Sequence, residues 1–129
     1  MNNILKIIKV VFGMLSGILA YLFGGADTLM WTLVFCIVAD YITGVMSAIY
    51  QRKLNSHIGY RGILKKIGIL VTVALGQLIG RLVGAEHIRE AVIGFYIANE
   101  GISILENVGR MDVKYLKTLK NILEQLHDI

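Results

Sequence analysis

Residues 28–50 read TLMWTLVFCIVADYITGVMSAIY, an apolar run in which Asp40 is the one charged side chain. A helix of this length covers about 34 Å, and the hydrocarbon core of a bilayer is about 30 Å thick. The run therefore predicts a membrane-spanning helix. A carboxylate at mid-depth costs about 2.5–3.5 kcal/mol on insertion scales, so we expect Asp40 to face protein or water rather than lipid.

Composition points to the same class of protein. The chain has 129 residues, of which 56% are hydrophobic and 17% are charged. A soluble domain of this size needs more polar surface, so the apolar excess is expected to face lipid. We predict an all-α integral membrane protein, with residues 1–129 forming one membrane domain.

Three further apolar runs have the length of a span. With the first run they predict four transmembrane helices, at about residues 10–26, 28–50, 67–84 and 91–108. Gly24-Gly25-Ala26-Asp27 predicts a tight turn between the first two. Asp112 can cap a C-terminal amphipathic helix over residues 112–128, which would lie on the membrane surface, pair with a second copy or form a solvated tail.

The basic residues set the expected orientation. With a cytoplasmic N-terminus, all but two of the 13 Lys and Arg fall on cytoplasmic segments, and only Arg81 and Arg89 lie near the outer face. This asymmetry follows the positive-inside rule and predicts that both termini are cytoplasmic. The predicted cytoplasmic anchors are Arg52, Lys53, Arg61, Lys65 and Lys66.

Two other interpretations of the first run stay open. One helical face carries Lys6, Lys9, Gly13, Ser16, Ala20 and Gly24. Such a face can lie along the headgroups, which gives an interfacial amphipathic helix and only three spans. Gly24-Gly25-Ala26 also fits the cleavage site of a secretory signal.

A second carboxylate, Glu100, interrupts the last apolar run at a depth similar to that of Asp40. The two could share a proton, or each could hydrogen-bond to Gln77, Asn99 or a tyrosine. Polar residues gather along one face of the predicted helix at 28–50 and along one face of the predicted helix at 91–108. These residues form either an internal network that fixes helix register or a face that meets water after several chains assemble. The candidate pore-lining or assembly residues are Asp40, Thr43, Gly44, Ser47, Gln77, Asn99, Glu100, Ser103, Glu106 and Asn107.

A ridge of small residues runs along the third span at steps of four. Helices in lipid associate through close backbone approach along such ridges. The predicted helix-packing residues are Gly68, Thr72, Gly76, Gly80 and Gly84.

The sequence argues against several functions. Cys36 is the one cysteine, so one chain can form neither a disulfide nor a cysteine-based zinc site. His57, His87 and His127 stand apart from one another, and no nucleophile, metal or phosphate-loop motif is present. Basic residues do not cluster with exposed aromatics. We therefore expect no catalysis, no cofactor, no metal and no nucleic-acid partner.

Two stretches resemble a known family. They are Asp40-Tyr41-Ile42-Thr43-Gly44, followed by Lys53, Ser56, Gly59, Gly62, Lys65 and Lys66, and then NEGISILENVG at residues 99–109. Together they resemble the phage-lysis and toxin-secretion holin family of Gram-positive bacteria and their phages, over about residues 31–109. The chain departs from the family in lacking a proline after residue 109, where Met111-Asp112-Val113 stands.

The resemblance implies a small protein of the bacterial cytoplasmic membrane. Its copies would accumulate and then form a homo-oligomeric lesion in the lipid bilayer at a set time, which releases a cell-wall hydrolase or a toxin without requiring direct contact with it. Carried over by position, Asp40, Thr43, Gly44, Glu100, Ser103, Glu106 and Asn107 would lie at the assembly surface or pore wall, and Lys53, Lys65 and Lys66 would anchor the cytoplasmic loop. The alternatives are a small ion channel or proton-coupled transporter subunit, and an antiholin that regulates a holin.

Overall fold

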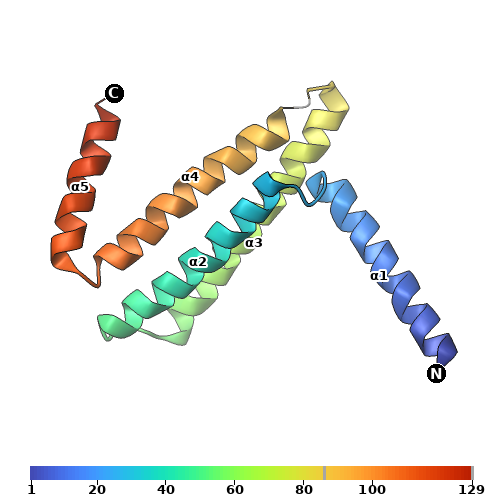
Figure 1. The fold of residues 1–129 in the computed structure, drawn as a ribbon, viewed down its shortest axis with the longest axis horizontal. Helices are drawn as coiled ribbons and strands as arrows, with labels where there is room; N and C mark the ends of the chain where they lie inside the picture. Colours follow the sequence, from blue (N-terminus) through green and yellow to red (C-terminus); the bar gives the residue numbers. More distant parts are fainter. Residues whose placement is uncertain (86, 129) are drawn as a thin grey trace.

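The protein is helical throughout the part that its computed structural model describes, residues 1–85 and 87–128, with all side chains there except those of residues 113–116. The helices are α1 (Asn2–Phe23), α2 (Thr28–Tyr50), α3 (Ser56–Val83), α4 (Ile88–Gly109) and α5 (Val113–His127). Helices α2, α3 and α4 lie side by side, whereas α1 and α5 extend away from them (Figure 1). The prediction of an all-helical protein is confirmed.

Local chemistry explains where these helices begin and end. Asp27 caps α2 by accepting a hydrogen bond from the Met30 N–H at 2.9 Å, and Asn55 caps α3 by accepting from the Ile58 N–H at 2.8 Å. The glycine after α1, Gly24, has a φ of 77°, a left-handed conformation that favours glycine. The chain therefore turns between α1 and α2 where the sequence predicts it.

Helices α1, α2 and α3 are long and apolar enough to cross a membrane. Helix α4 is not among them, although its length is sufficient. The polar side chains of Asn99, Glu100 and Asn107 lower its hydropathy. The predicted number of four spans is therefore not confirmed by length and composition.

A small apolar core joins α2, α3 and α4. Leu33, Val73 and Ile93 are fully buried, with one residue from each helix, and Met30 and Ile69 pack with them. These residues lie in the half of the bundle where α2 and α4 begin. Lipid tails are as apolar as leucine, so van der Waals contacts, rather than the exclusion of water, supply this stabilisation in a membrane.

Helix α1 has no buried residue and contacts the bundle only near its C-terminal end. The Arg81 guanidinium lies over the Tyr21 ring, 4.1 Å from its centroid. The backbone carbonyl of Phe23 accepts a hydrogen bond from Arg89 Nε. The remaining length of α1 exposes apolar side chains such as Ile8 and Phe12.

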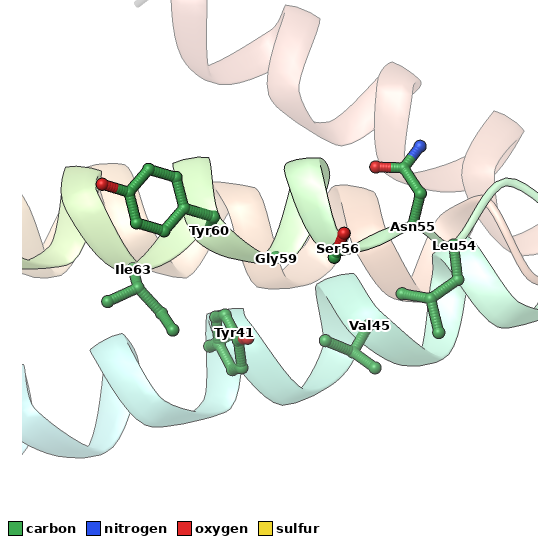
Figure 2. A pocket seen from close by; sticks show the side chains of 8 residues that line it. All are labelled: Tyr41, Val45, Leu54, Asn55, Ser56, Gly59, Tyr60 and Ile63. Atoms are coloured by element: carbon green, nitrogen blue, oxygen red, sulfur yellow. The ribbon is translucent and has the colours of Figure 1, made fainter.

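Tyr41 of α2 lies against two glycines of α3. A Cβ added at Gly59 would stand 3.4 Å from the Tyr41 hydroxyl oxygen, and one at Gly62 would stand 3.5 Å from the ring. Beside this contact is a mostly apolar hollow of about 630 Å³, which we call the apolar recess (Figure 2). It is lined by Tyr41, Val45, Leu54, Asn55, Ser56, Gly59, Tyr60 and Ile63.

An arginine clamp holds the start of α4 against the turn between α1 and α2. Arg89 is buried, and its two terminal nitrogens contact the two Asp27 carboxylate oxygens at 2.9 and 3.0 Å. It also donates to the Gly25 carbonyl at 3.2 Å. A Cβ at Gly24 would stand 2.6 Å from Arg89 Nε, so the glycine leaves room for the clamp.

The clamp changes the acidity of Asp27, which lies in the turn outside the predicted spans. The hydrogen bonds from Arg89 and then from the Met30 N–H lower the pKa of Asp27 from 3.8 to about 2. A carboxyl whose pKa is lower in the folded state stabilises the fold above its unfolded pKa. That contribution is lost as the pH falls through the folded pKa.

The substitution Asp27→Asn tests the clamp. It keeps an oxygen for the Met30 N–H but removes the charge beside Arg89, so we expect a loss of about 1–2 kcal/mol at neutral pH. In detergent, the gap in unfolding free energy between wild type and variant should be constant above about pH 5 and shrink toward pH 2. The exposed-site control, Asp128→Asn, should leave stability unchanged. A gap that persists undiminished at pH 2 would contradict the assignment.

The predicted glycine ridge of α3 divides into two parts. Gly76 and Gly80 are buried, and a Cβ at Gly80 would stand 2.7 Å from the Ala85 carbonyl oxygen. Among the described residues, no atom lies within 4 Å of a Cβ added at Gly68, and Thr72 of the same helix donates its hydroxyl to the Gly68 carbonyl at 2.8 Å. Gly84 ends the helix with a φ of 72°. Close packing therefore uses only part of the ridge.

The pair Gly80→Ala and Gly68→Ala tests this division. At Gly80 the added methyl group meets a backbone carbonyl, so we expect a loss of about 1–3 kcal/mol. At Gly68 it meets nothing, so the higher helix propensity of alanine should leave stability unchanged or raise it by up to about 1 kcal/mol. Thermal unfolding in detergent, followed by circular dichroism, measures both effects. Equal destabilisation by the two variants would show that the whole ridge is packed.

Candidate functional site

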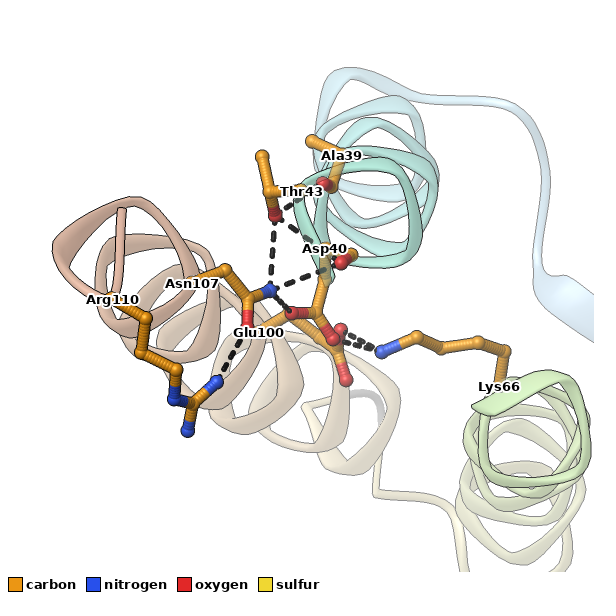
Figure 3. A network of polar contacts seen from close by, with 7 residues as sticks. All are labelled: Ala39, Asp40, Thr43, Lys66, Glu100, Asn107 and Arg110. Atoms are coloured by element: carbon orange, nitrogen blue, oxygen red, sulfur yellow. Dashed lines mark hydrogen bonds and ion pairs between the residues drawn. The ribbon is translucent and has the colours of Figure 1, made fainter. Parts of the chain in front are cut away.

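Asp40 and Glu100 meet at a lysine. Lys66 Nζ contacts the Asp40 carboxylate and lies 2.5 Å from Glu100 Oε2 (Figure 3). The side chains of Lys66, Asp40 and Glu100 are 15%, 11% and 5% exposed, so the charges are largely shielded from the surroundings. We call these three residues the ion cluster. It ties α2, α3 and α4 together, because each helix supplies one member.

Asn107 extends the network between α4 and α2. Its Nδ2 group donates to Asp40 Oδ1 at 2.8 Å, to the Asp40 carbonyl at 3.1 Å and to Thr43 Oγ1 at 3.0 Å. Its Oδ1 atom accepts from Arg110 Nη1 at 2.9 Å. Asn107 is only 5% exposed, and no buried side-chain polar atom among the described residues lacks a partner. A satisfied network of this kind fixes the register of the two helices.

The network borders a hollow of about 880 Å³, which we call the polar groove. It is formed by α2 from residue 40 onward, by the α2–α3 loop, by α3 up to residue 72, by α4 from residue 96 onward and by Arg110, which follows α4. The groove thus begins beside Ile69 of the apolar core and extends to the end of the bundle where α2 and α4 finish. Its charged lining residues are Asp40, Lys53, Lys65, Lys66, Glu100, Glu106 and Arg110.

Most of the polar residues selected from the sequence lie at this groove. The lining includes Asp40, Gly44, Ser47, Asn99, Glu100, Ser103, Glu106 and Asn107. Thr43 joins through its bond to Asn107. Gln77 does not join, because its side chain lies near Gly24 at the other end of the bundle. The polar stripes of α2 and α4 therefore face each other.

Lys66 is the member that sequence reasoning did not connect with the carboxylates. Charge counting placed it among the loop anchors, but the helix begins at Ser56 and Lys66 lies within it. A signal was available in the spacing, since Ile69 and Val73 follow at steps of three and four on the same face and both are buried. A lysine on the core face of a helix calls for a buried acidic partner.

The other predicted anchors are exposed at the same end of the bundle. Arg52 and Lys53 lie in the α2–α3 loop, and Arg52 has a positive φ of 56°. Arg61 and Lys65 project from the first half of α3. Lys53 and Lys65 line the polar groove. No group of three or more His, Cys, Asp or Glu in the described part of the chain could hold a metal ion.

The pair Lys66→Met and Lys65→Met tests the ion cluster. Removing the Lys66 charge leaves two buried carboxylates without their cation, so we expect a loss of about 3–5 kcal/mol. Removing the charge of Lys65, which is exposed, should change stability by less than about 0.5 kcal/mol. Thermal unfolding and size-exclusion chromatography in detergent measure the effect. Adding Asp40→Asn and Glu100→Gln to Lys66→Met should restore part of the stability, and a failure to do so would contradict the charge explanation.

Comparison of the sequence with known proteins identifies relatives of this chain. A protein of Listeria innocua is 48% identical over 124 residues, which cover 95% of this chain and 86% of the relative. A 14.9 kDa protein of Clostridium perfringens is 39% identical over 130 residues, or 99% of this chain and 98% of the relative.

One relative is a phage protein whose name states a role. The probable holin of Bacillus phage phi105 is 36% identical over 96 residues, which cover 74% of this chain and 70% of the relative. No solved structure matches the chain significantly. The bacteriophage holin family matches residues 17–128. Three long apolar helices fit a multi-pass protein of the cytoplasmic membrane, and the chain belongs to the bacteriophage holin family.

Proposed function

We propose that this protein is a holin that assembles in the bacterial cytoplasmic membrane into a timed lesion, through which a cell-wall hydrolase or a toxin passes. Family membership supports a holin role and favours a non-enzymatic membrane protein. The observation that carries the proposal is the ion cluster, in which Asp40, Lys66 and Glu100 are held between helices that have strongly apolar outer surfaces. The partners are the lipid bilayer and further copies of the chain, without direct contact to the exported protein.

The proposed topology has four spans and two cytoplasmic termini. Helix α4 runs in the same direction as α2 and opposite to α3 (Figure 1). Successive membrane spans must alternate in direction in this way. Its polar residue Glu100 is buried and contacts Lys66 of α3. Asn107 is also buried and contacts Asp40 of α2, whereas Phe95 is exposed. With its polar side chains buried in the bundle and apolar side chains outside, α4 can lie in lipid although its average composition is more polar than that of a usual span. The distribution of Lys and Arg supports the orientation.

The mechanism follows from where the polar groups lie. In a single copy, Lys66 pairs with Asp40 and Glu100, and Asn107 donates to Asp40. Above a critical surface density, exchange of these contacts for contacts with other copies would give a ring whose polar faces meet water. Each chain that joins the ring improves the site for the next, so the onset is abrupt. The same exchange of contacts then explains both why single copies accumulate without damage and why lysis is sudden.

Co-expression tests the proposal. The chain is produced in bacteria together with a cell-wall hydrolase that has no export signal, and culture density is followed. We expect a delayed and sudden fall in density, because the lesion must pass a folded enzyme. Glu100→Leu and Asp40→Leu should insert but lose timed lysis. Glu90→Leu makes the same change at an exposed site on α4, and its timing should match wild type.

Other outcomes would reject the proposal. Leakage of ions without leakage of protein-sized markers from vesicles would indicate a channel or transporter subunit. A chain that delays lysis by another holin, but causes none itself, would be an antiholin. Normal timing in both carboxylate variants would reject the ion cluster as the carrier of the mechanism.

A further inference from the structure

Unpaired cations stand on the wall of the polar groove. Lys53, from the α2–α3 loop, and Lys65, from α3, have no ion-pair partner among the described residues. Arg110 stands on the α4 side, where it donates to Asn107 and lies 4.0 Å from Glu106. Because a guanidinium has five N–H donors, Arg110 keeps capacity for a further acceptor.

The charge balance of the groove favours an anionic ligand. Its lining contains four cationic residues and three carboxylates. Deep in the groove, the two carboxylates of the ion cluster already contact Lys66. The cationic excess therefore lies nearer the mouth, with Lys53 and Lys65. Lysine and arginine together are the usual ligands of a phosphate group.

The length of α3 places these cations at the level of lipid phosphates. Its 28 residues extend about 42 Å, whereas the hydrocarbon core is about 30 Å thick. For an upright helix, roughly 12 Å therefore lies among headgroups, and tilt shortens this excess. Arg81, at the far end, can snorkel to the opposite interface. The excess then falls on about the first eight residues of α3, and the Lys65 side chain, just beyond them, can reach the inner headgroup layer.

The apolar recess adjoins the polar groove. The two hollows share Tyr41, Val45, Leu54 and Gly59 in their linings. Lys53 precedes Leu54 directly, so a cation stands where the hollows meet. The polar groove suits a charged headgroup, and the apolar recess suits a hydrocarbon chain.

We propose that the groove and the recess together bind one anionic phospholipid of the inner leaflet. Its phosphate contacts Lys53 and Lys65, with Arg110 as a third donor, and one acyl chain lies in the recess. Basic pockets between transmembrane helices on the cytoplasmic side are suited to such headgroups. The assignment to the inner leaflet rests on the topology given under the proposed function. The binding itself requires no lesion, so a failure of lipid binding and a failure of timed lysis are distinguishable.

Native mass spectrometry and thermal unfolding of the purified full chain in neutral detergent test the site. The probes are phosphatidylglycerol, phosphatidylcholine and glycerol phosphate. The variant Lys53→Gln/Lys65→Gln removes two groove cations that make no ion pair with described residues. The matched control, Lys117→Gln/Lys120→Gln, removes two exposed cations from α5, so the change in net charge is the same.

We expect wild type to retain one phosphatidylglycerol molecule and to unfold at a higher temperature in its presence. The groove variant should bind this lipid at least about tenfold more weakly, and the α5 variant should bind it as wild type does. Equal retention of phosphatidylcholine would overturn the proposal, as would equal weakening in both double variants. Equal stabilisation by glycerol phosphate would overturn the assignment to a lipid, in favour of a soluble phosphate ligand.

Discussion

The fold depends on one constraint, which is that the charges of Asp40, Lys66 and Glu100 must be satisfied away from lipid. The desolvation of each ion is offset only while its partners stay in place. Because α2, α3 and α4 each supply one member, the cluster acts as a tie among all three helices. Asn107 adds a direct bond between α4 and α2. No hydrophobic force draws helices together in a bilayer, so this tie and the small apolar core must position them.

The two halves of the bundle differ in how they can open. At the end where α2 and α4 begin, fully buried Leu33, Val73 and Ile93 and the clamp of Arg89 on Asp27 hold the helices closely. At the other end the helices border an 880 Å³ groove, and polar contacts replace apolar packing. Local opening occurs where buried apolar contacts are few. Separation of α2 and α4 would therefore start at the ion cluster and leave the apolar end as a hinge.

The sequence predicts much of this fold because its signals are local. The glycine turn at residues 24–27, the all-helical class and the polar faces of α2 and α4 follow from spacing and composition. The partner of Asp40 does not, because a pairing between helices is a tertiary choice that no local pattern encodes. Charge counting groups Lys66 with the loop cations, because it treats every lysine near the end of a span alike. The glycine ridge likewise showed where α3 can pack, but not that only Gly76 and Gly80 would do so.

The position of the groove links lipid binding to assembly. A ligand that binds the single copy, but not the assembled one, stabilises the single copy by RT ln(1 + [L]/Kd). Because the proposed assembly exchanges the contacts of the ion cluster for contacts with other copies, those copies would approach the groove that Lys65, Glu106 and Arg110 also line. An anionic lipid held there must then leave, or be shared, before neighbouring copies can replace the contacts of the ion cluster. The density at which copies assemble would rise with the anionic lipid content of the membrane, so bilayer composition and the ion cluster would act on the same equilibrium.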